Sequence, residues 1–116
     1  MVTYGQMGYI VHIKDLDMRE LSETAPGKDI KEIFNGERRR ILDIALVGGS
    51  VLSKHRAAEP ITVLCLSGSG TFRAGSDLED SQKLVPGTLI TLETGVDHEV
   101  VGEPAVRILV TRFKDN

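Results

Sequence analysis

The 116-residue chain has a single cysteine, no tryptophan, two tyrosines and three phenylalanines. The lone Cys65 cannot form an intrachain disulfide, which excludes a small secreted scaffold held together by cross-links. Cys65 lies between Leu64 and Leu66 with no basic neighbour, so we interpret it as a buried apolar residue rather than a nucleophile. The few aromatic residues and the net charge of −3 argue against stacking on bases and against attraction to phosphate backbones. We therefore expect no nucleic-acid partner.

Long apolar runs are also missing, and the first residues lack the basic and apolar segments of a signal peptide. We expect no membrane partner and a cytoplasmic location. The length allows one domain with a modest core, and 41% hydrophobic with 27% charged residues is typical of a globular protein. We expect one domain over residues 1–116, in which residues 1–39 form N-terminal strands and turns that pack on a barrel core at 40–116.

What the chain does contain is a series of short β-rich runs separated by glycine turns. The alternation in residues 40–47 places Leu42, Ile44 and Leu46 on one face of a strand. We predict further strands at 9–13, 30–34, 61–66, 71–74, 88–92, 98–101 and 106–110, and one or two helical turns at 14–21. Many short strands at nearly even spacing indicate an all-β barrel or sandwich.

Two stretches, at 49–70 and 86–98, each place a histidine in a frame of glycines. The framing positions are Gly49, His55, Gly68 and Gly70 in the first stretch, and Gly87, Gly95 and His98 in the second. In this order, on predicted strand–turn–strand units, the two stretches resemble the paired motifs of the cupin superfamily and its small, single-domain, RmlC-like members. The resemblance implies an all-β, single-domain, cupin-type jelly-roll β-barrel, to which we add the short N-terminal helical turn.

The resemblance also implies a metal pocket, for which cupins use two histidines and a glutamate of the first motif and a histidine of the second. This sequence departs from that pattern. Ala57 occupies the second histidine position, Ile61 the glutamate position, and Glu93 replaces the proline of the second motif. Of the four usual ligands only His55 and His98 remain.

Glu59 is the candidate third metal ligand. Strand alternation from His55 places it on the same face, although the following Pro60 favours a bend. Two histidines and a carboxylate suit a divalent transition metal, here Zn, Fe, Mn or Ni. The alternative is that His55 and His98 are neutral, hydrogen-bonded residues of a barrel that has lost its metal.

Two arginines complete the candidate ligand-binding residues. Arg73 and Arg107 lie mid-strand among apolar neighbours, and we interpret each as an edge residue or as an anchor for an anionic ligand, with the edge interpretation favoured. Asp97 precedes His98, so on a strand the two side chains point to opposite faces and do not form an acid–base pair.

Three functions remain open. The first is a barrel that binds a small molecule, with or without a divalent metal, in a degenerate two-histidine pocket. The second, implied by the resemblance, is a metal-dependent enzyme of dioxygenase or isomerase type acting on a small oxygen-bearing substrate. A metal-free variant of that enzyme uses His55 or His98 as general base. The third is a purely structural dimer module.

We expect a homodimer. The resemblance implies one, and the second face of the strand at 40–47 agrees, because Ile41, Ala45 and Val47 need cover. His12, in a predicted terminal strand, is interpreted as a surface or interface residue.

Overall fold

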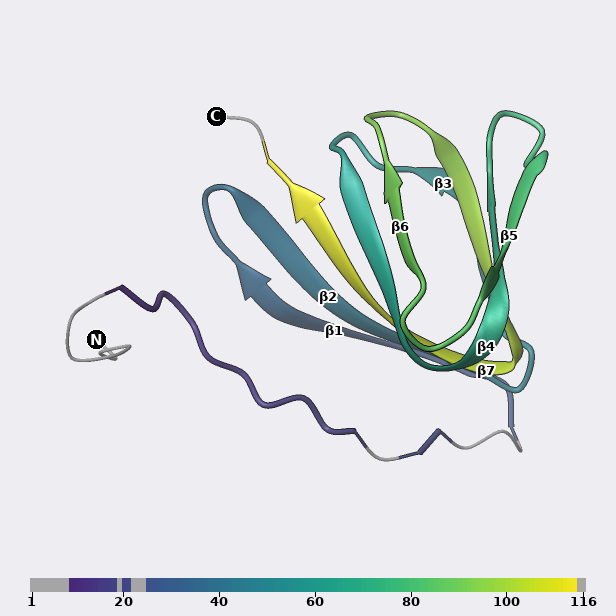
Figure 1. Cartoon of the computed structure of the whole chain (residues 1–116), viewed down its shortest axis with the longest axis horizontal. Coiled ribbons are helices and arrows are strands. Elements are labelled where there is room, and N and C mark those ends of the chain that lie inside the picture. Colours follow the sequence, from purple (N-terminus) through teal and green to yellow (C-terminus); the bar gives the residue numbers. More distant parts are fainter. Residues whose placement is uncertain (1–8, 19, 22–24, 115–116) are drawn as a thin grey trace.

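The computed structural model describes residues 9–18, 20–21 and 25–114, and the regular elements in this part of the chain are all β-strands (Figure 1). They are β1 (Gly27–Asn35), β2 (Arg39–Val47), β3 (Val51–Arg56), β4 (Ile61–Ala74), β5 (Asp80–Leu84), β6 (Leu89–Leu92) and β7 (Asp97–Phe113). Among the described residues, no helix is long and apolar enough to cross a membrane.

The strands form one antiparallel sheet in the order β1-β2-β7-β4-β5, with β3 also paired to β7 and β6 also paired to β4. Two long strands organise it, because β4 and β7 pair with each other from end to end and share their other edges between several partners. Figure 1 shows the sheet curled round on itself, with β3 and β5 on the side opposite β1 and β2. This curl encloses the core.

The curl depends on two glycines of the first motif. The register between β4 and β7 shifts at Cys65/Ser67 and again at Gly68/Gly70. Gly68 has a φ of 78°, and a Cβ there would collide with the carbonyl of Ala105, as one at Gly70 would with that of Val101. Only glycine lets the two long strands bend this close to each other.

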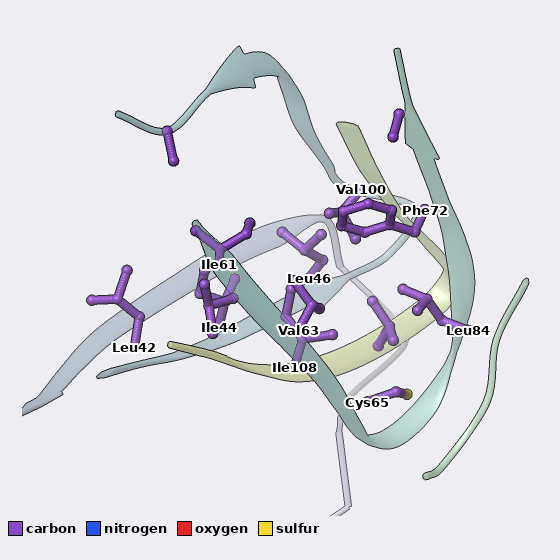
Figure 2. Packing of buried hydrophobic residues seen from close by; sticks show 14 residues of the cluster. Leu42, Ile44, Leu46, Ile61, Val63, Cys65, Phe72, Leu84, Val100 and Ile108 are labelled. Atoms are coloured by element: carbon purple, nitrogen blue, oxygen red, sulfur yellow. The ribbon is translucent and has the colours of Figure 1, made fainter. Parts of the chain in front are cut away.

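The core lies between the facing halves of the sheet. Leu42, Ile44 and Leu46 of β2 are buried there, which confirms the face predicted from their alternation. Figure 2 shows them gathered with the labelled side chains of β4 and β7 in the same interior. Cys65 is buried among them, and this burial raises the pKa of its thiol, as expected of an apolar core residue.

The N-terminal elements were predicted wrongly. Residues 9–13 form no strand, and no helical turn occurs in 14–18 or 20–21. The apolar side chains of 9–13 stay exposed, with Tyr9 80% accessible, and no described strand pairs with this segment. High β-propensity without a partner strand does not produce a strand, because pairing and burial supply most of the stabilisation.

Two strands were missed, and two long strands were each predicted as two short ones. The mostly polar segments β3 and β5 are strands because they pair with β7 and β4. The runs predicted at 61–66 and 71–74 belong to the single strand β4. The runs predicted at 98–101 and 106–110 belong to the single strand β7, which continues through the expected turn between them.

The outer face of the sheet carries apolar side chains with only partial cover among the described residues. Ile41, Ala45 and Val47 of β2 are half-buried, and Leu89 of β6 is 65% exposed. A second copy of the chain would cover this face. The homodimer stays a prediction.

The two leucines Leu46 and Leu89 test where the core lies. Leu46→Ala should lower the unfolding free energy by about 2–5 kcal/mol, because it removes a fully buried side chain. Leu89→Ala, a matched control at an exposed site, should change it by less than about 0.5 kcal/mol. Urea unfolding measures both values, and equal effects of the two substitutions would contradict the assigned core.

Candidate functional site

The two histidines of the glycine-framed motifs face each other across neighbouring strands. In the antiparallel pairing of β3 with β7, His55 lies directly opposite His98. Their ring centroids are 4.2 Å apart with an angle of 59° between the planes. Phe72 of β4 stacks on His98 with a centroid separation of 5.7 Å and an angle of 10°. The structure thus brings together the two side chains that the sequence singled out.

Both imidazoles are oriented in the same way by their own strands. The Nδ1 of His55 lies 2.7 Å from the carbonyl oxygen of Ser53, and the Nδ1 of His98 lies 3.0 Å from that of Val96. A carbonyl oxygen only accepts hydrogen bonds, so each Nδ1 carries a proton. In the neutral ring Nε2 is then the basic nitrogen, and it remains available to a ligand.

The two rings differ in their surroundings, because His55 is exposed whereas His98 is 4% exposed. Burial lowers the pKa of His98 from its ordinary value of 6.5, and the charges of His55 and Arg112 act in the same direction. The carbonyl of Val96 and the carboxylate of Asp97 oppose the shift without reversing it. His98 is therefore neutral at pH 7.

A cavity of about 90 Å³ opens beside these rings. Its walls are mainly aliphatic and come from β2, β3, β4 and β7, and two arginines are among the lining residues. The lining residues are Leu42, Ile44, Leu52, His55, Arg56, Ala57, Ile61, Val63, Phe72, His98, Val100, Ile108, Val110 and Arg112. The arrangement suits a small ligand with an apolar body and one polar group near the imidazoles.

No protein-family model matches the chain, and no curated protein matches its sequence. Solved structures do match it over most of its length. A cupin superfamily protein from Desulfitobacterium hafniense is 16% identical, with 84% of each chain covered and a TM-score of 0.72. An RmlC-like cupin with a double-stranded β-helix fold from Methanocaldococcus jannaschii is 16% identical, with 84% of this chain and 90% of that one covered and a TM-score of 0.67. The chain has the cupin fold.

A third structure, a conserved protein of unknown function from Streptococcus pyogenes, has 16% identity to this cupin-fold chain and a TM-score of 0.73. The match covers 93% of this chain and 98% of the Streptococcus pyogenes protein. The fold expected from the two motifs is therefore confirmed, whereas identities this low carry no information on ligand or reaction.

The metal implied by the cupin resemblance does not fit the residues of this cavity. Ala57 and Ile61, which stand at two of the usual ligand positions, are buried apolar parts of the wall. Glu59 does not join the histidines, because its Oε1 accepts a hydrogen bond from Arg112 Nε at 2.9 Å and forms an ion pair with Nη2 of the same arginine at 2.8 Å. The described residues contain no group of three metal-binding side chains, and a transition-metal site needs at least three.

Neither of the two predicted arginine anchors lies in the cavity. Arg73 is exposed, 3.6 Å from Glu99. Arg107 is buried on the other face of the sheet, where Nε and Nη2 bond to the two carboxylate oxygens of Asp43 at 2.9 and 2.6 Å. Arg107 also donates to the carbonyl of Asp17, which ties the N-terminal segment to the sheet.

Two further predictions from the sequence concern Asp97 and His12. Asp97 turns away from the His98 ring and pairs with Arg56, whose hydrogen bond lowers the pKa of the Asp97 carboxyl. His12 is exposed, as expected of a surface residue, with its ring 5.4 Å from that of Phe34.

Sequence reasoning missed Phe72 and Arg112. Phe72 lies on the second half of β4, which only the curl of the sheet brings over the histidines. Arg112 could have been predicted from the sequence, because alternation in the last strand places it on the same face as Ile108 and Val110.

The buried His98 makes the unfolding free energy of the protein depend on pH in a defined direction. Because folding lowers the pKa of His98, the unfolded chain binds this proton first as the pH falls. The stabilisation from the neutral, buried His98 is therefore fully present above about pH 6.5. It is lost as the pH falls from there through the folded-state pKa. NMR titration should give a His98 midpoint below about 6.5, and His98→Gln should remove this part of the pH dependence measured by urea unfolding. A midpoint at or above that value would contradict the assignment.

The two arginines outside the histidine cavity should differ in their contribution to stability. Arg107→Met leaves the Asp43 carboxylate buried without its partner and should cost about 3–5 kcal/mol of unfolding free energy. Arg73→Met removes an exposed ion pair and should cost less than about 1 kcal/mol. Chemical denaturation measures both costs. An Arg107 variant as stable as the Arg73 variant would show that the buried Arg107–Asp43 pair does not stabilise the protein.

Proposed function

We propose that the protein binds a small molecule with a hydroxyl group on an apolar body, in the cavity beside His55 and His98 and without a resident metal. The observation that carries this proposal is the pair of imidazoles 4.2 Å apart whose Nδ1 atoms are both bonded to backbone carbonyls. The two adjacent neutral rings then each present an Nε2 lone pair that can accept a hydrogen bond. A ligand hydroxyl is such a donor, whereas an ether or ketone oxygen is not.

The apolar walls and the size of the cavity limit the ligand further. Leu42, Ile44 and Val63 would bury its carbon skeleton, with a gain proportional to the apolar area removed from water. The volume of about 90 Å³ lies well below the roughly 300–1,000 Å³ of pockets that take drug-sized molecules. We therefore infer a ligand of only a few carbon atoms.

The enzyme alternatives have less support. The dioxygenase or isomerase chemistry implied by the cupin resemblance depends on a metal that the described residues do not fit. A neutral His98 with a free Nε2 has the properties of a general base, yet among the described residues only the histidines and arginines of the cavity carry protons for such chemistry. Binding is the function that the site supports best.

The test uses 1,3-butanediol as the probe, with 2-butanone as the control that lacks a donor. The diol should shift the NMR signals of both histidine rings and bind with a Kd of about 1 mM, as expected of so small a ligand. His98→Phe keeps an aromatic ring but removes the acceptor, and should weaken diol binding about tenfold. His12→Phe, a matched substitution at an exposed histidine outside the cavity, should leave it unchanged.

Two results would overturn this proposal. The first is unshifted His55 and His98 signals with the diol, or equal binding in the His98→Phe variant. The second concerns the metal: protein loaded with Zn, Fe, Mn or Ni and then dialysed should keep far less than one ion per chain by elemental analysis. One ion per chain, lost in both His55→Gln and His98→Gln, would restore the metal-dependent alternative.

A further inference from the structure

Arg112, which lines the histidine cavity, belongs to a cluster of cations that the proposed function does not use. We propose that Arg40, Arg112 and Lys114 form an oxyanion subsite there, so that the ligand is a small hydroxy acid. This inference rests on the proposed function for the hydroxyl end of the ligand and adds the chemistry of its other end.

The first observation is a pair of like charges side by side. Arg40 of β2 and Arg112 of β7 are directly opposite in the register, on the face that bears the core residues of both strands. Like charges opposite each other destabilise an antiparallel pair. Each is offset by one carboxylate, since Glu32 bonds to Arg40 and Glu59 to Arg112. Two arginines opposite each other therefore do not serve the stability of the sheet, which favours a role in binding.

The second observation is that donors remain available. In both ion pairs a single carboxylate oxygen takes Nε and Nη2, so among the described residues the Nη1 group of Arg40 and of Arg112 has no partner. Lys114 Nζ donates to the neutral oxygens of Asn35 and Gly36. Three cations thus face two carboxylates. This local excess of positive charge, in a chain with a net charge of −3, attracts anions to the cluster around Arg112.

The third observation is a second cavity at these side chains, which has Arg112 as a lining residue in common with the histidine cavity. It has a volume of about 170 Å³ and is lined by Asn35, Arg40, Glu59, Arg112 and Lys114. Arg112 lines both cavities, and its charge contributes to the lowered pKa of His98. A ligand with its hydroxyl at the imidazoles can therefore reach Arg112 with a carboxylate. The planar guanidinium group matches the geometry of an oxyanion.

The test compares two probes that differ at one end. 3-Hydroxybutyrate carries a carboxylate where 1,3-butanediol carries a hydroxymethyl group. On the wild-type protein the acid should bind about tenfold more tightly than the diol, since a charge-assisted hydrogen bond is the stronger one. The advantage should shrink as salt is raised from about 0.01 M to about 1 M, because the subsite is partly exposed. Calorimetry or NMR line shifts measure both affinities.

Substitutions then locate the subsite. Arg112→Gln and Lys114→Gln should each reduce the ratio of acid affinity to diol affinity several-fold. Arg73→Gln, which breaks a comparable arginine–glutamate pair outside the cavity, should leave that ratio unchanged. Equal binding of acid and diol to the wild type, or an unchanged ratio in both subsite variants, would overturn the inference. The salt dependence of the wild type decides the matter even where a variant fails to fold.

The outcomes separate the two proposals. Diol binding that shifts the histidine signals, without any advantage for the acid, leaves the proposed function standing and removes the oxyanion subsite. Acid binding that depends on Arg112 and Lys114 but leaves His55 and His98 unshifted supports the subsite and removes the hydroxyl-binding role of the imidazoles.

Discussion

The close approach of β4 and β7 at their bends is the constraint on which the rest of the structure depends. Gly68 and Gly70 leave room for the carbonyls of Ala105 and Val101, so two long strands can remain paired while the sheet turns back on itself. The bends divide each strand into two halves that face each other. One half of β4 and β7 supplies the aliphatic floor of the cavity, and the other brings Phe72 and His98 over it.

The side chains of the resulting site offer hydrogen-bonding and charged groups, and two positions where the cupin pattern has metal ligands are apolar. Ala57 and Ile61 stand where the cupin pattern places ligands, and both contribute buried apolar surface to the wall. The carboxylate of Glu59, which alternation favours as a third ligand, instead neutralises Arg112. A guanidinium at the edge of the cavity and a missing third ligand both disfavour a bound cation, and both favour a neutral or anionic ligand.

The arginines show why local sequence is a poor guide to the role of a charge. Arg73 and Arg107 have similar apolar neighbours in the sequence, yet one is exposed and the other is buried against Asp43. The difference comes from what packs on each face of the sheet, since β2 places Asp43 beside Arg107 and the Asp17 carbonyl covers it. Arg112, the arginine that does line the cavity, follows the alternation of the last strand and could be predicted from it.

The sequence by itself determined the strand-rich class of fold, the inner face of β2, the buried state of Cys65 and the two histidines of the cavity, because alternation and glycine spacing are local properties. Tertiary structure alone decided which polar segments became strands, and left the apolar segment at 9–13 without a partner strand among the described residues. It also decided the partner of Glu59 and the place of Phe72. These outcomes depend on contacts between residues far apart in the chain, and the energy of a strand or an ion pair comes from such contacts rather than from the propensity of its own residues.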